Sequence, residues 1–387
     1  MVRLSVPASG GPESALEVAL GAPADPGTRR VLITGLSTYW GGRLAQALER
    51  FEQIEAIIGV DSREPTVELE RTEFVKVSNQ HSLIERIVRA ADIDTVVDTR
   101  LVVSSVAVAP REMHENNVIG TMNILAGCAG SDSPVRKFIF KSSAHCYGSA
   151  QDDPAFFTEE MPRARPAGSL LERDVIDAEA AVEDFAQKNR DVAVTVIRFA
   201  NVLGSDVDTA FTRLFSLPLV PMVLGFDPRL QFIHEDDVVH ALEHAAFHLV
   251  PGVYNAAADG VLALSEAIGL LGKRPLPVLP PWGAGILAGP LRRLGFRIPD
   301  EILGLLRFGR GLDNRLLKAT GFEYGFTSRE TVLDLAEHLR LDPVMRGREE
   351  TYIYEREVEE FLRWSRHVRR GGERDEGVGA DREVLGI

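Results

Sequence analysis

The chain has 387 residues, of which 45% are hydrophobic and 26% charged, as is typical of a folded globular protein with a full core. Its formal net charge of −14 argues against a general nucleic-acid binder. Only Cys128 and Cys146 occur, so no disulfide framework is implied and a reducing, cytoplasmic compartment fits. We expect neither a secretory signal nor a membrane span, because no apolar run reaches about 18 residues.

The N-terminal arm and the segment that follows it differ in composition. Residues 1–28 are rich in Gly, Pro, Ala and Ser, which predicts a disordered arm. Over residues 29–204, short apolar runs alternate with helical patterns. This alternation indicates an α/β fold with a doubly wound parallel sheet, the Rossmann arrangement that binds dinucleotides.

A glycine turn follows the first predicted strand. Residues 31–33 form a short apolar run, Gly35 turns the chain, and helical spacing begins at Gly41. A strand, a glycine turn and a helix N-terminus bind anions, usually a dinucleotide pyrophosphate, because free N–H groups and the helix dipole meet there. Thr38 fills the middle place of this Gly-x-x-Gly-x-x-Gly pattern, where a glycine normally lets the backbone approach the ligand.

The next predicted strand, residues 57–60, ends at Asp61. A carboxylate at this position hydrogen-bonds the adenine-ribose hydroxyls, which favours NAD over NADP. Arg63 is close enough to qualify that preference, since an arginine accommodates a 2′-phosphate. The alternative interpretation is an ordinary doubly wound domain that binds no cofactor.

The rest of the alternating pattern predicts further strands and helices in order along the chain. The expected strands are 73–77, 95–98, 137–141 and 193–198, and the expected helices are 81–90, 112–129 and 171–188. Ser142 and Ser143 come directly after a predicted strand. Side chains at such strand ends share the ligand-binding edge of a parallel sheet.

The order of these motifs resembles the extended short-chain dehydrogenase/reductase family, especially its NAD-dependent nucleotide-sugar epimerases and dehydratases such as UDP-galactose 4-epimerase. The resemblance covers about residues 30–341 and includes the following segments: Thr34-Gly35 to Gly41, Asp61, Asn117 to Thr121, Ser142 to Gly148, Arg198 to Gly204 and Phe232 to Asp237. It implies an NAD cofactor, with Asn117 among the cofactor-binding residues, and a nucleotide-sugar substrate.

The resemblance also implies a homodimer. Family members pair through the helices that correspond here to residues 112–129 and 171–188. Ala178, Ala181 and Val182 offer a small apolar patch for such close packing.

The catalytic set that the resemblance implies is incomplete. In the family a tyrosine takes the proton, a lysine one helical turn later lowers the pKa of that tyrosine and holds the nicotinamide ribose, and a serine binds the substrate oxygen. Ser143 matches the serine, but Leu171 and Val175 stand at the tyrosine and lysine positions. Asp98-Thr99-Arg100 is a further departure, where relatives have a run of small residues.

Other side chains could carry the proton instead. His145 follows Ser143 closely and has an unperturbed pKa of about 6.5, although a solvated loop histidine is the simpler interpretation. Tyr147 is expected to be a packed structural residue. Two sets of acidic residues are expected to be helix caps or solvated charges: Glu172, Asp174 and Asp177 near one helix start, and Asp236 and Asp237 at another.

Beyond residue 205 prolines become frequent, which predicts a smaller C-terminal substrate domain over residues 205–345. Segments near 230–257 are expected to return to the main sheet as strands at 230–233 and 252–255. His240, His244 and His248 are spaced four residues apart, and we interpret this stripe as the wet side of an amphipathic helix rather than a metal site, so no metal is expected.

The C-terminal end predicts an amphipathic helix over residues 346–370 and a disordered tail over 371–387. Two functional hypotheses follow from the whole sequence. The first is an atypical NAD-binding oxidoreductase or epimerase acting on a nucleotide sugar, with Ser143 and His145 in catalysis. The alternative is a non-catalytic dinucleotide-binding sensor or scaffold.

Overall fold

The computed structural model describes residues 27–77, 81–104, 108–248, 251–278 and 300–345. The amphipathic helix and tail predicted beyond residue 345, and residues 1–26 of the predicted arm, lie outside the described residues. Thr28, the last residue of the predicted arm, is buried, and its hydroxyl donates to the carbonyl of Ala246. The boundary predicted at residue 28 is therefore wrong, because the packed part of the chain already includes Thr28.

A seven-stranded parallel sheet forms the centre of the fold, in the order β12-β7-β5-β4-β1-β2-β3. Its strands are β1 Arg30–Thr34, β2 Ala56–Asp61, β3 Thr72–Lys76, β4 Thr95–Asp98, β5 Lys137–Ser143, β7 Ala193–Phe199 and β12 Gly252–Ala256. Both faces are covered, so the strands other than the edge strand β3 are buried over most of their length and are rich in Val, Ile and Phe. The predicted doubly wound parallel sheet is confirmed.

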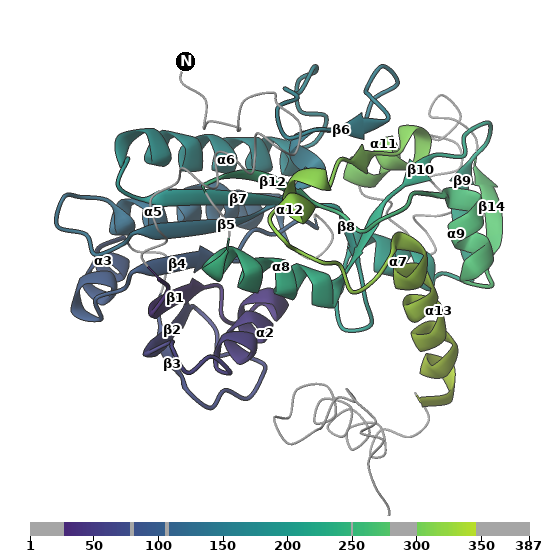
Figure 1. Ribbon diagram of the computed structural model, residues 1–387. Helices are drawn as coiled ribbons and strands as arrows, with labels where there is room; N and C mark the ends of the chain where they lie inside the picture. The colour runs from purple at the N-terminus through teal and green to yellow at the C-terminus, as the bar shows by residue number, and fades with distance from the viewer. Residues whose placement is uncertain (1–26, 78–80, 105–107, 249–250, 279–299, 346–387) are drawn as a thin grey trace, which may run out of the picture. The chain divides into compact units, whose positions relative to one another are not determined.

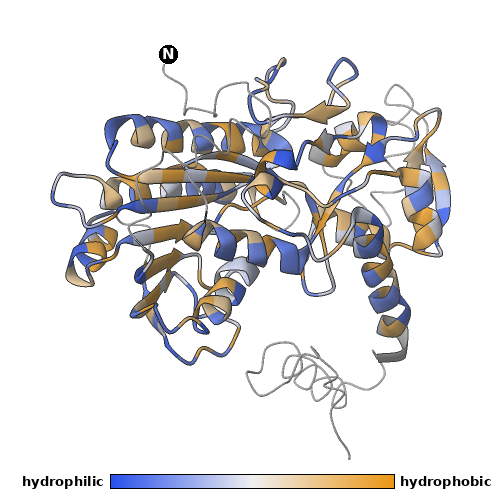
Figure 2. Ribbon diagram, in the orientation of Figure 1, coloured by the Kyte–Doolittle hydropathy of each residue, from blue (hydrophilic) through white to orange (hydrophobic). Residues whose placement is uncertain are grey.

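Helices cover the two faces of this sheet (Figure 1). Helices α2 (Tyr39–Leu48) and α8 (Glu235–Phe247) pack together on one face, and α3 (His81–Ala90), α5 (Thr121–Cys128) and α6 (Leu170–Lys188) lie on the other. Figure 2 shows apolar strands between helices that alternate apolar and polar residues. The apolar residues of each helix face the sheet, as the helical spacing in the sequence predicts.

The helix predicted over residues 112–129 is interrupted. It consists of α4 (Pro110–His114), a π-helical turn η1 (Glu115–Gly120) and α5. The wider turn includes Asn117, which is buried and bonded to the backbone of another loop. Hydrophobic periodicity did not predict the break, because a single π-turn shifts the pattern by one residue without adding a helix breaker.

A smaller, irregular part is formed mostly by the chain after β7, together with β6 before it, and contains four two-stranded ladders among the described residues (Figure 1). They pair β8 (Asn201–Leu203) with β11 (Phe232–His234), β9 (Leu219–Val223) with β14 (Arg274–Val278), β10 (Arg229–Leu230) with β13 (Leu262–Ala263), and β6 (Phe156–Phe157) with β15 (Gly311–Leu312). The remaining helices are η2 (Ala144–Cys146), α7 (Ala210–Ser216), α9 (Leu264–Leu270), α11 (Asp300–Phe308), α12 (Arg315–Ala319) and α13 (Ser328–Met345).

The two strands predicted to return to the main sheet have different positions. The strand expected at 252–255 is confirmed, because β12 pairs with β7 at the edge of the sheet. The one expected at 230–233 is wrong: β11 pairs in parallel with β8 outside the main sheet. β8 follows β7 after one residue, so the chain bends away and gives β11 a separate partner.

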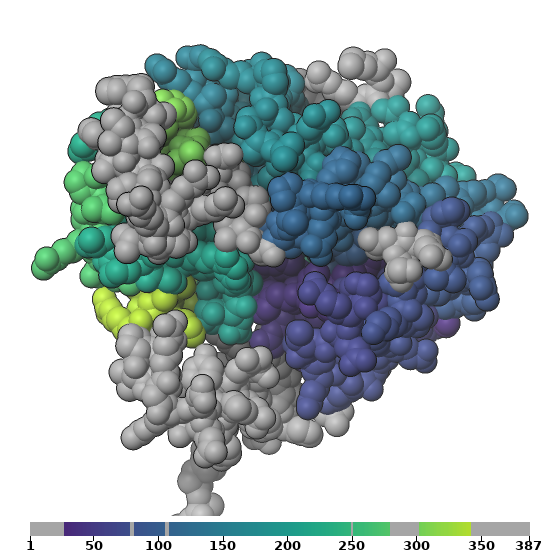
Figure 3. Space-filling view, turned by 180° about the vertical axis from the view of Figure 1, so that it is seen from behind, coloured from purple at the N-terminus to yellow at the C-terminus, as the bar shows by residue number. Residues whose placement is uncertain are grey.

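One compact unit ends at Glu337 and a second begins at His338, within α13. The first unit contains the main sheet and the irregular part, so a separate substrate domain over residues 205–345 remains a prediction. Viewed from behind, the purple and blue residues of the N-terminal half lie on one side of this unit and the green segments beyond residue 205 on the other (Figure 3). Among the described residues, no helix is long and apolar enough to cross a membrane.

Candidate functional site

The glycine turn after β1 depends on close packing. Gly35 has a φ of 83°, in the left-handed region that favours glycine, and its N–H donates to the Val60 carbonyl at 3.0 Å. A Cβ on Gly41 would lie 2.2 Å from the Gly35 carbonyl oxygen. A side chain at position 41 would push helix α2 away from the turn, which explains why glycine occupies both outer places of the pattern.

Thr38 fills the middle place as the N-cap of α2. Its hydroxyl accepts from the Gly41 N–H at 3.1 Å and donates to the Gly35 carbonyl at 2.7 Å. The same hydroxyl lies 3.3 Å from that of Thr99, which follows β4. The threonine therefore caps the helix and closes the turn, where a glycine would leave more room for a ligand.

Asp61 ends β2 beside this turn. Its Oδ2 accepts from the Ser37 N–H at 3.0 Å and from the Ser37 hydroxyl at 2.7 Å, and its Oδ1 accepts from the Ser62 N–H at 2.6 Å. Arg63 is exposed, and its N–H lies 3.4 Å from Oδ1. The structure thus brings the predicted ribose-binding carboxylate against the predicted anion site, as the motif spacing requires.

A buried ion pair follows β4 on the other side of the turn. Asp98 is fully buried and accepts from Nε and Nη2 of Arg100, each at 3.1 Å, and from the Thr34 hydroxyl at 2.8 Å. A Cβ on Gly35 would lie 2.5 Å from Cγ of Arg100, so the arginine stem lies against the turn. Where the resemblance implies small residues, this chain has two charges that compensate each other.

Asn117 ties down the loop that continues from this ion pair. Its Oδ1 accepts from the Val102 N–H at 2.8 Å, and its Nδ2 donates to the Val102 carbonyl at 2.8 Å. The amide of Asn117 therefore fixes backbone at the carboxyl end of β4. A direct contact between Asn117 and a cofactor remains a prediction.

Ser143 is the last residue of β5 and the N-cap of the short helix η2. Its hydroxyl accepts from the His145 N–H at 3.4 Å, and its side chain is 6% exposed. Its neighbour Ser142 points to the other face of the sheet, where its hydroxyl donates to Glu179 of α6. Ser143 is thus placed at the carboxyl edge of the sheet, where ligands of this fold class bind.

His145 is buried rather than solvated, so the simpler interpretation drawn from the sequence is wrong. Burial, with the positive charges of Arg310 and Arg163, holds its pKa well below the usual value. Among the described residues, its Nδ1 has no hydrogen-bond partner. A neutral imidazole with a free ring nitrogen can accept a hydrogen bond or a proton from a ligand.

Two arginines that the sequence analysis did not single out surround this histidine. Nη1 of Arg163 donates to the His145 carbonyl at 3.2 Å, and Nη1 of Arg310 donates to the Gly148 carbonyl at 3.1 Å. Both arginines are far from His145 in sequence, Arg310 by more than 160 residues. No local pattern in the sequence could have revealed them.

The face of α6 that should carry the tyrosine and lysine is apolar. Leu171 is 1% exposed and Val175 is 0% exposed. Two of the nearby acidic residues are buried, although the sequence analysis expects helix caps or solvated charges. Glu172 forms a buried ion pair with Arg163, and Asp174 is buried 2.7 Å from Nδ1 of His114. Asp177 matches the expectation, because it is part-exposed near Arg173.

A polar network links β5, β7 and β12. Nη1 of Arg198 donates to the Tyr147 hydroxyl at 2.8 Å, and that hydroxyl donates to Oδ1 of Asn255 at 2.9 Å. Nη2 of Arg198 pairs with Glu179 at 2.7 Å. Burial raises the pKa of Tyr147, and its ring stacks on Phe157, so it is the packed structural residue that was predicted.

The first turn of α8 is capped differently from the prediction. The N-cap is His234, whose Nδ1 accepts from the Asp236 N–H at 3.2 Å. Asp237 is buried and accepts from the N–H groups of Gly325 at 2.7 Å and Phe326 at 3.2 Å. The two aspartates are therefore not the cap, and Asp237 holds a distant loop against the helix.

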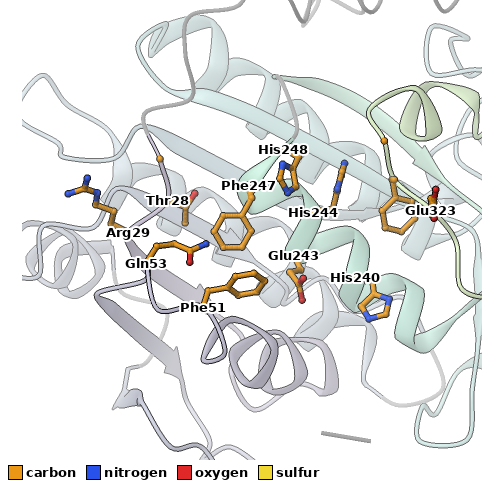
Figure 4. A pocket seen from close by; sticks show the side chains of 13 residues that line it. Thr28, Arg29, Phe51, Gln53, His240, Glu243, His244, Phe247, His248 and Glu323 are labelled. Carbon is orange, nitrogen blue, oxygen red and sulfur yellow. The ribbon is translucent and has the colours of Figure 1, made fainter. Parts of the chain in front are cut away.

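His240 and His244 of α8, and His248 directly after it, lie along a pocket at the opposite end of the sheet from the glycine turn (Figure 4). The cavity has a volume of about 570 Å³, and His240, His244 and His248 line it together with Phe51 and Phe322. Burial and the neighbouring His248 lower the pKa of His244 to about 4. Among the described residues, no cluster of His, Cys, Asp or Glu could hold a metal ion.

Comparison with known families identifies the class of the protein. The model of the NAD dependent epimerase/dehydratase family matches residues 31–257, which include the glycine turn, Asp61 and Ser143. The chain belongs to this family, and NAD is the cofactor. The resemblance to the extended short-chain dehydrogenase/reductases is thereby confirmed.

The individual proteins that resemble this chain share about a third of its residues or fewer. An uncharacterized protein of Mycobacterium tuberculosis is 34% identical over 327 residues, which cover 81% of this chain and 85% of the relative. A probable UDP-arabinose 4-epimerase of Oryza sativa is 24% identical and covers 59% of this chain and 55% of its own length.

Solved structures share the fold. A UDP-glucose 4-epimerase of Thermotoga maritima, with UDP-glucose, has a TM-score of 0.62 at 21% identity and covers 81% of this chain and 99% of its own. A UDP-glucuronic acid 4-epimerase of Bacillus cereus, in complex with NAD, has a TM-score of 0.61 at 15% identity and covers 81% of this chain and 96% of its own.

Proposed function

We propose that this protein is an NAD-dependent oxidoreductase of the epimerase/dehydratase type that acts on a nucleotide sugar with an atypical acid–base group. The observation that carries the proposal is the geometry of the adenine half of the site: a packed glycine turn, a helix N-terminus capped by Thr38 and a strand-end carboxylate meet at one edge of the sheet. The family membership of the chain and the sugar-nucleotide enzymes that share its fold support the same conclusion.

The residues around the turn fit the cofactor. The N–H groups of the α2 N-terminus, framed by Gly35, Thr38 and Gly41, would hold the pyrophosphate, and Asp61 would bind the adenine ribose, whose hydroxyls would compete with Ser37 for Oδ2. Arg63 is exposed at the same edge, and Asn117 fixes the neighbouring loop. When bound, NAD supplies the hydride acceptor for the oxidation of a sugar hydroxyl.

Ser143 would bind the substrate oxygen in this proposal, and His145 would take its proton. The free Nδ1 of His145 and the burial of both side chains support this assignment. The depressed pKa keeps His145 neutral at pH 7, so the ring can accept a hydrogen bond, while burial and the two arginines oppose the imidazolium that a proton transfer would form.

The test is to purify the protein, identify any retained nucleotide by mass spectrometry, and add candidate nucleotide sugars while recording the absorbance of reduced nicotinamide. A retained NAD that becomes reduced when a sugar is added would support the proposal. Protein that neither retains nor binds NAD would contradict it.

One observation favours a second candidate, a non-catalytic dinucleotide-binding sensor or scaffold. Leu171 and Val175 are fully packed, so the helix that should present the proton carrier is closed to solvent. Such a protein would bind NAD, yet no sugar would change the absorbance of the bound cofactor. The same titration therefore separates the two candidates.

A further inference from the structure

The strand order fixes where the two halves of a bound dinucleotide lie. Asp61 at the end of β2 marks the adenine half, and the α2 N-terminus after β1 marks the pyrophosphate. In a doubly wound sheet the ligand extends across the carboxyl ends of the strands from one half to the other. The nicotinamide half therefore lies beyond β1, over the ends of β4, β5 and β7.

A buried lysine lies in this region. Lys141, two residues before Ser143 on β5, is 2% exposed, and its Nζ lies 4.9 Å from the ring centre of Trp40 and 5.9 Å from that of Phe199. Trp40 belongs to the first turn of α2, and Phe199 ends β7. The side chain of Lys141 lies on the face opposite α6, since Ser142, the next residue, bonds to Glu179 of that helix.

The ammonium group of Lys141 has aromatic neighbours but no acceptor. Among the described residues, no hydrogen bond or ion pair to its Nζ is found, and a buried ammonium without an acceptor is costly. Two aromatic faces offset part of this cost. The remaining cost depends on the charge of the ligand group that lies next to the ammonium.

The other charged groups around Lys141 have hydrogen-bond or ion-pair partners of their own, and burial raises the pKa of Glu235 to about 7, so this carboxyl also titrates near pH 7. Burial lowers the pKa of Lys141 to about 8, and the carboxylate of Asp98 on the neighbouring strand opposes this shift. Asp98 itself is paired with Arg100. The other titratable groups on the elements that pack against this part of β5 are engaged elsewhere: Arg198 with Glu179, Arg43 with Asp206 and the ring of Tyr39, Glu235 with the Ser205 and Asp206 N–H groups, and Asp237 with the Gly325 N–H.

We propose that Lys141 determines which redox form of the cofactor this protein prefers: its ammonium faces the nicotinamide half of the site and favours the uncharged reduced ring over the pyridinium cation. The inference rests on the proposed binding of NAD at the glycine turn. The oxidised ring carries a positive charge, so a second positive charge buried close to it weakens binding. The reduced ring is neutral and pays no such penalty.

This coupling predicts a pH dependence of binding. We take NAD⁺ to bind only when Lys141 is deprotonated. Because the pKa of Lys141 is about 8, NAD⁺ should then bind roughly tenfold more weakly at pH 7 than at pH 9. The pyrophosphate is common to both forms, so the affinity for NADH should not fall at pH 7, and the ratio of the two affinities isolates the effect of the ring charge. The dissociation constants of both forms can be measured by calorimetry on the whole protein at the two pH values.

Three variants test the assignment. In Lys141→Met, the affinity for NAD⁺ at pH 7 should rise and its pH dependence should disappear. In Lys141→Arg, which keeps its charge at both pH values, NAD⁺ should bind weakly at pH 7 and at pH 9. Lys137→Met is the matched control: Lys137 is buried on the same strand and face but at the opposite end, where its Nζ donates to the Ala246 carbonyl at 2.7 Å, and this variant should keep the wild-type pH dependence.

The outcomes are distinct. Equal pH profiles for NAD⁺ and NADH in the wild-type protein, which need no variant, would overturn the inference while leaving the proposed function intact. A pH dependence that survives in Lys141→Met would do the same. Failure of both cofactor forms to bind at either pH would overturn the proposed function, and the inference with it.

Discussion

Placing the family's tyrosine and lysine at positions 171 and 175 of α6 should have two separate effects, one on the stability of the fold and one on catalysis. Val175 is 0% exposed and belongs to the main hydrophobic core, so a lysine placed there is buried. A fully buried lysine has its pKa lowered by about 3 units or more, and each unit corresponds to about 1.4 kcal/mol. We therefore expect Val175→Lys to lower the free energy of unfolding by about 4 kcal/mol at pH 7.

Val175→Met is the control, since it has a similar unbranched stem and no charge. Urea unfolding of both variants at pH 7 isolates the cost of the charge. The lysine in the unfolded chain titrates near pH 10.4, above the pKa of the buried lysine, so the unfolded state binds the extra proton and the stability of Val175→Lys should rise toward pH 10. Equal stability of the two variants at pH 7 would refute this reasoning, because it would mean that position 175 borders an open, wet site.

The double variant Leu171→Tyr, Val175→Lys addresses the chemistry. Because the wild-type face of α6 carries neither group, we expect the epimerisation of UDP-galactose to be absent or very slow. General acid–base groups contribute about 10²- to 10⁴-fold, so the double variant should raise any trace activity, provided that it still folds and binds NAD. Rapid turnover by the wild-type protein would show that another group carries the proton.

Three further predictions follow from the site. NAD should bind more tightly than NADP in calorimetry, and Asp61→Ala should narrow the difference; equal affinities in the wild-type protein would contradict this. Where the wild-type protein turns over a nucleotide sugar, His145→Ala should abolish that turnover and leave NAD binding intact, whereas an unchanged rate would exclude His145 as the acid–base group. The protein should be a homodimer by light scattering at micromolar concentration, and Met122→Glu on the exposed side of α5 should give a monomer, since Met122 is 51% exposed. A wild-type monomer would contradict the dimer.

The surface that would form this dimer differs from the one expected. Ala178 and Val182 are each 0% exposed, because they pack against the sheet of their own protomer. The exposed apolar side chains on these helices are instead Ile119, Met122 and Leu170. Small residues at helical spacing indicate that a close contact exists, but the spacing alone does not say whether the sheet or a second subunit makes it.

The parts of the site that the sequence predicted are those set by local spacing. The glycine turn and Asp61 follow from an apolar run, a turn and a strand end within about 30 residues, and the structure brings them together as expected. The inner strands of the sheet are buried on both faces, so their apolar runs are nearly unbroken and easy to recognise, whereas the edge strand β3 is only partly buried.

The parts of the site that the sequence did not predict depend on contacts between distant segments of the chain. The burial of His145 involves Arg163 and Arg310, and the setting of Lys141 involves Trp40 and Phe199, from two other elements. A histidine on a turn and a lysine on a strand look alike in sequence whether they are exposed or enclosed. Only the tertiary packing distinguishes a solvated charge from a functional one.

Where this chain departs from the family pattern, two of the charged residues that replace it have ion-pair partners, as expected of a site that is still used. A site released from function would be expected to accumulate charges without partners, which are costly to bury. Here Arg100 is paired with Asp98, and Glu172 is paired with Arg163. The Nδ1 of His145 is one of several buried side-chain atoms without a hydrogen-bond partner among the described residues, and a ligand or water can supply the missing partner. These two ion pairs indicate a maintained site, which both the enzyme and the sensor require, so the choice between them rests on the cofactor titration.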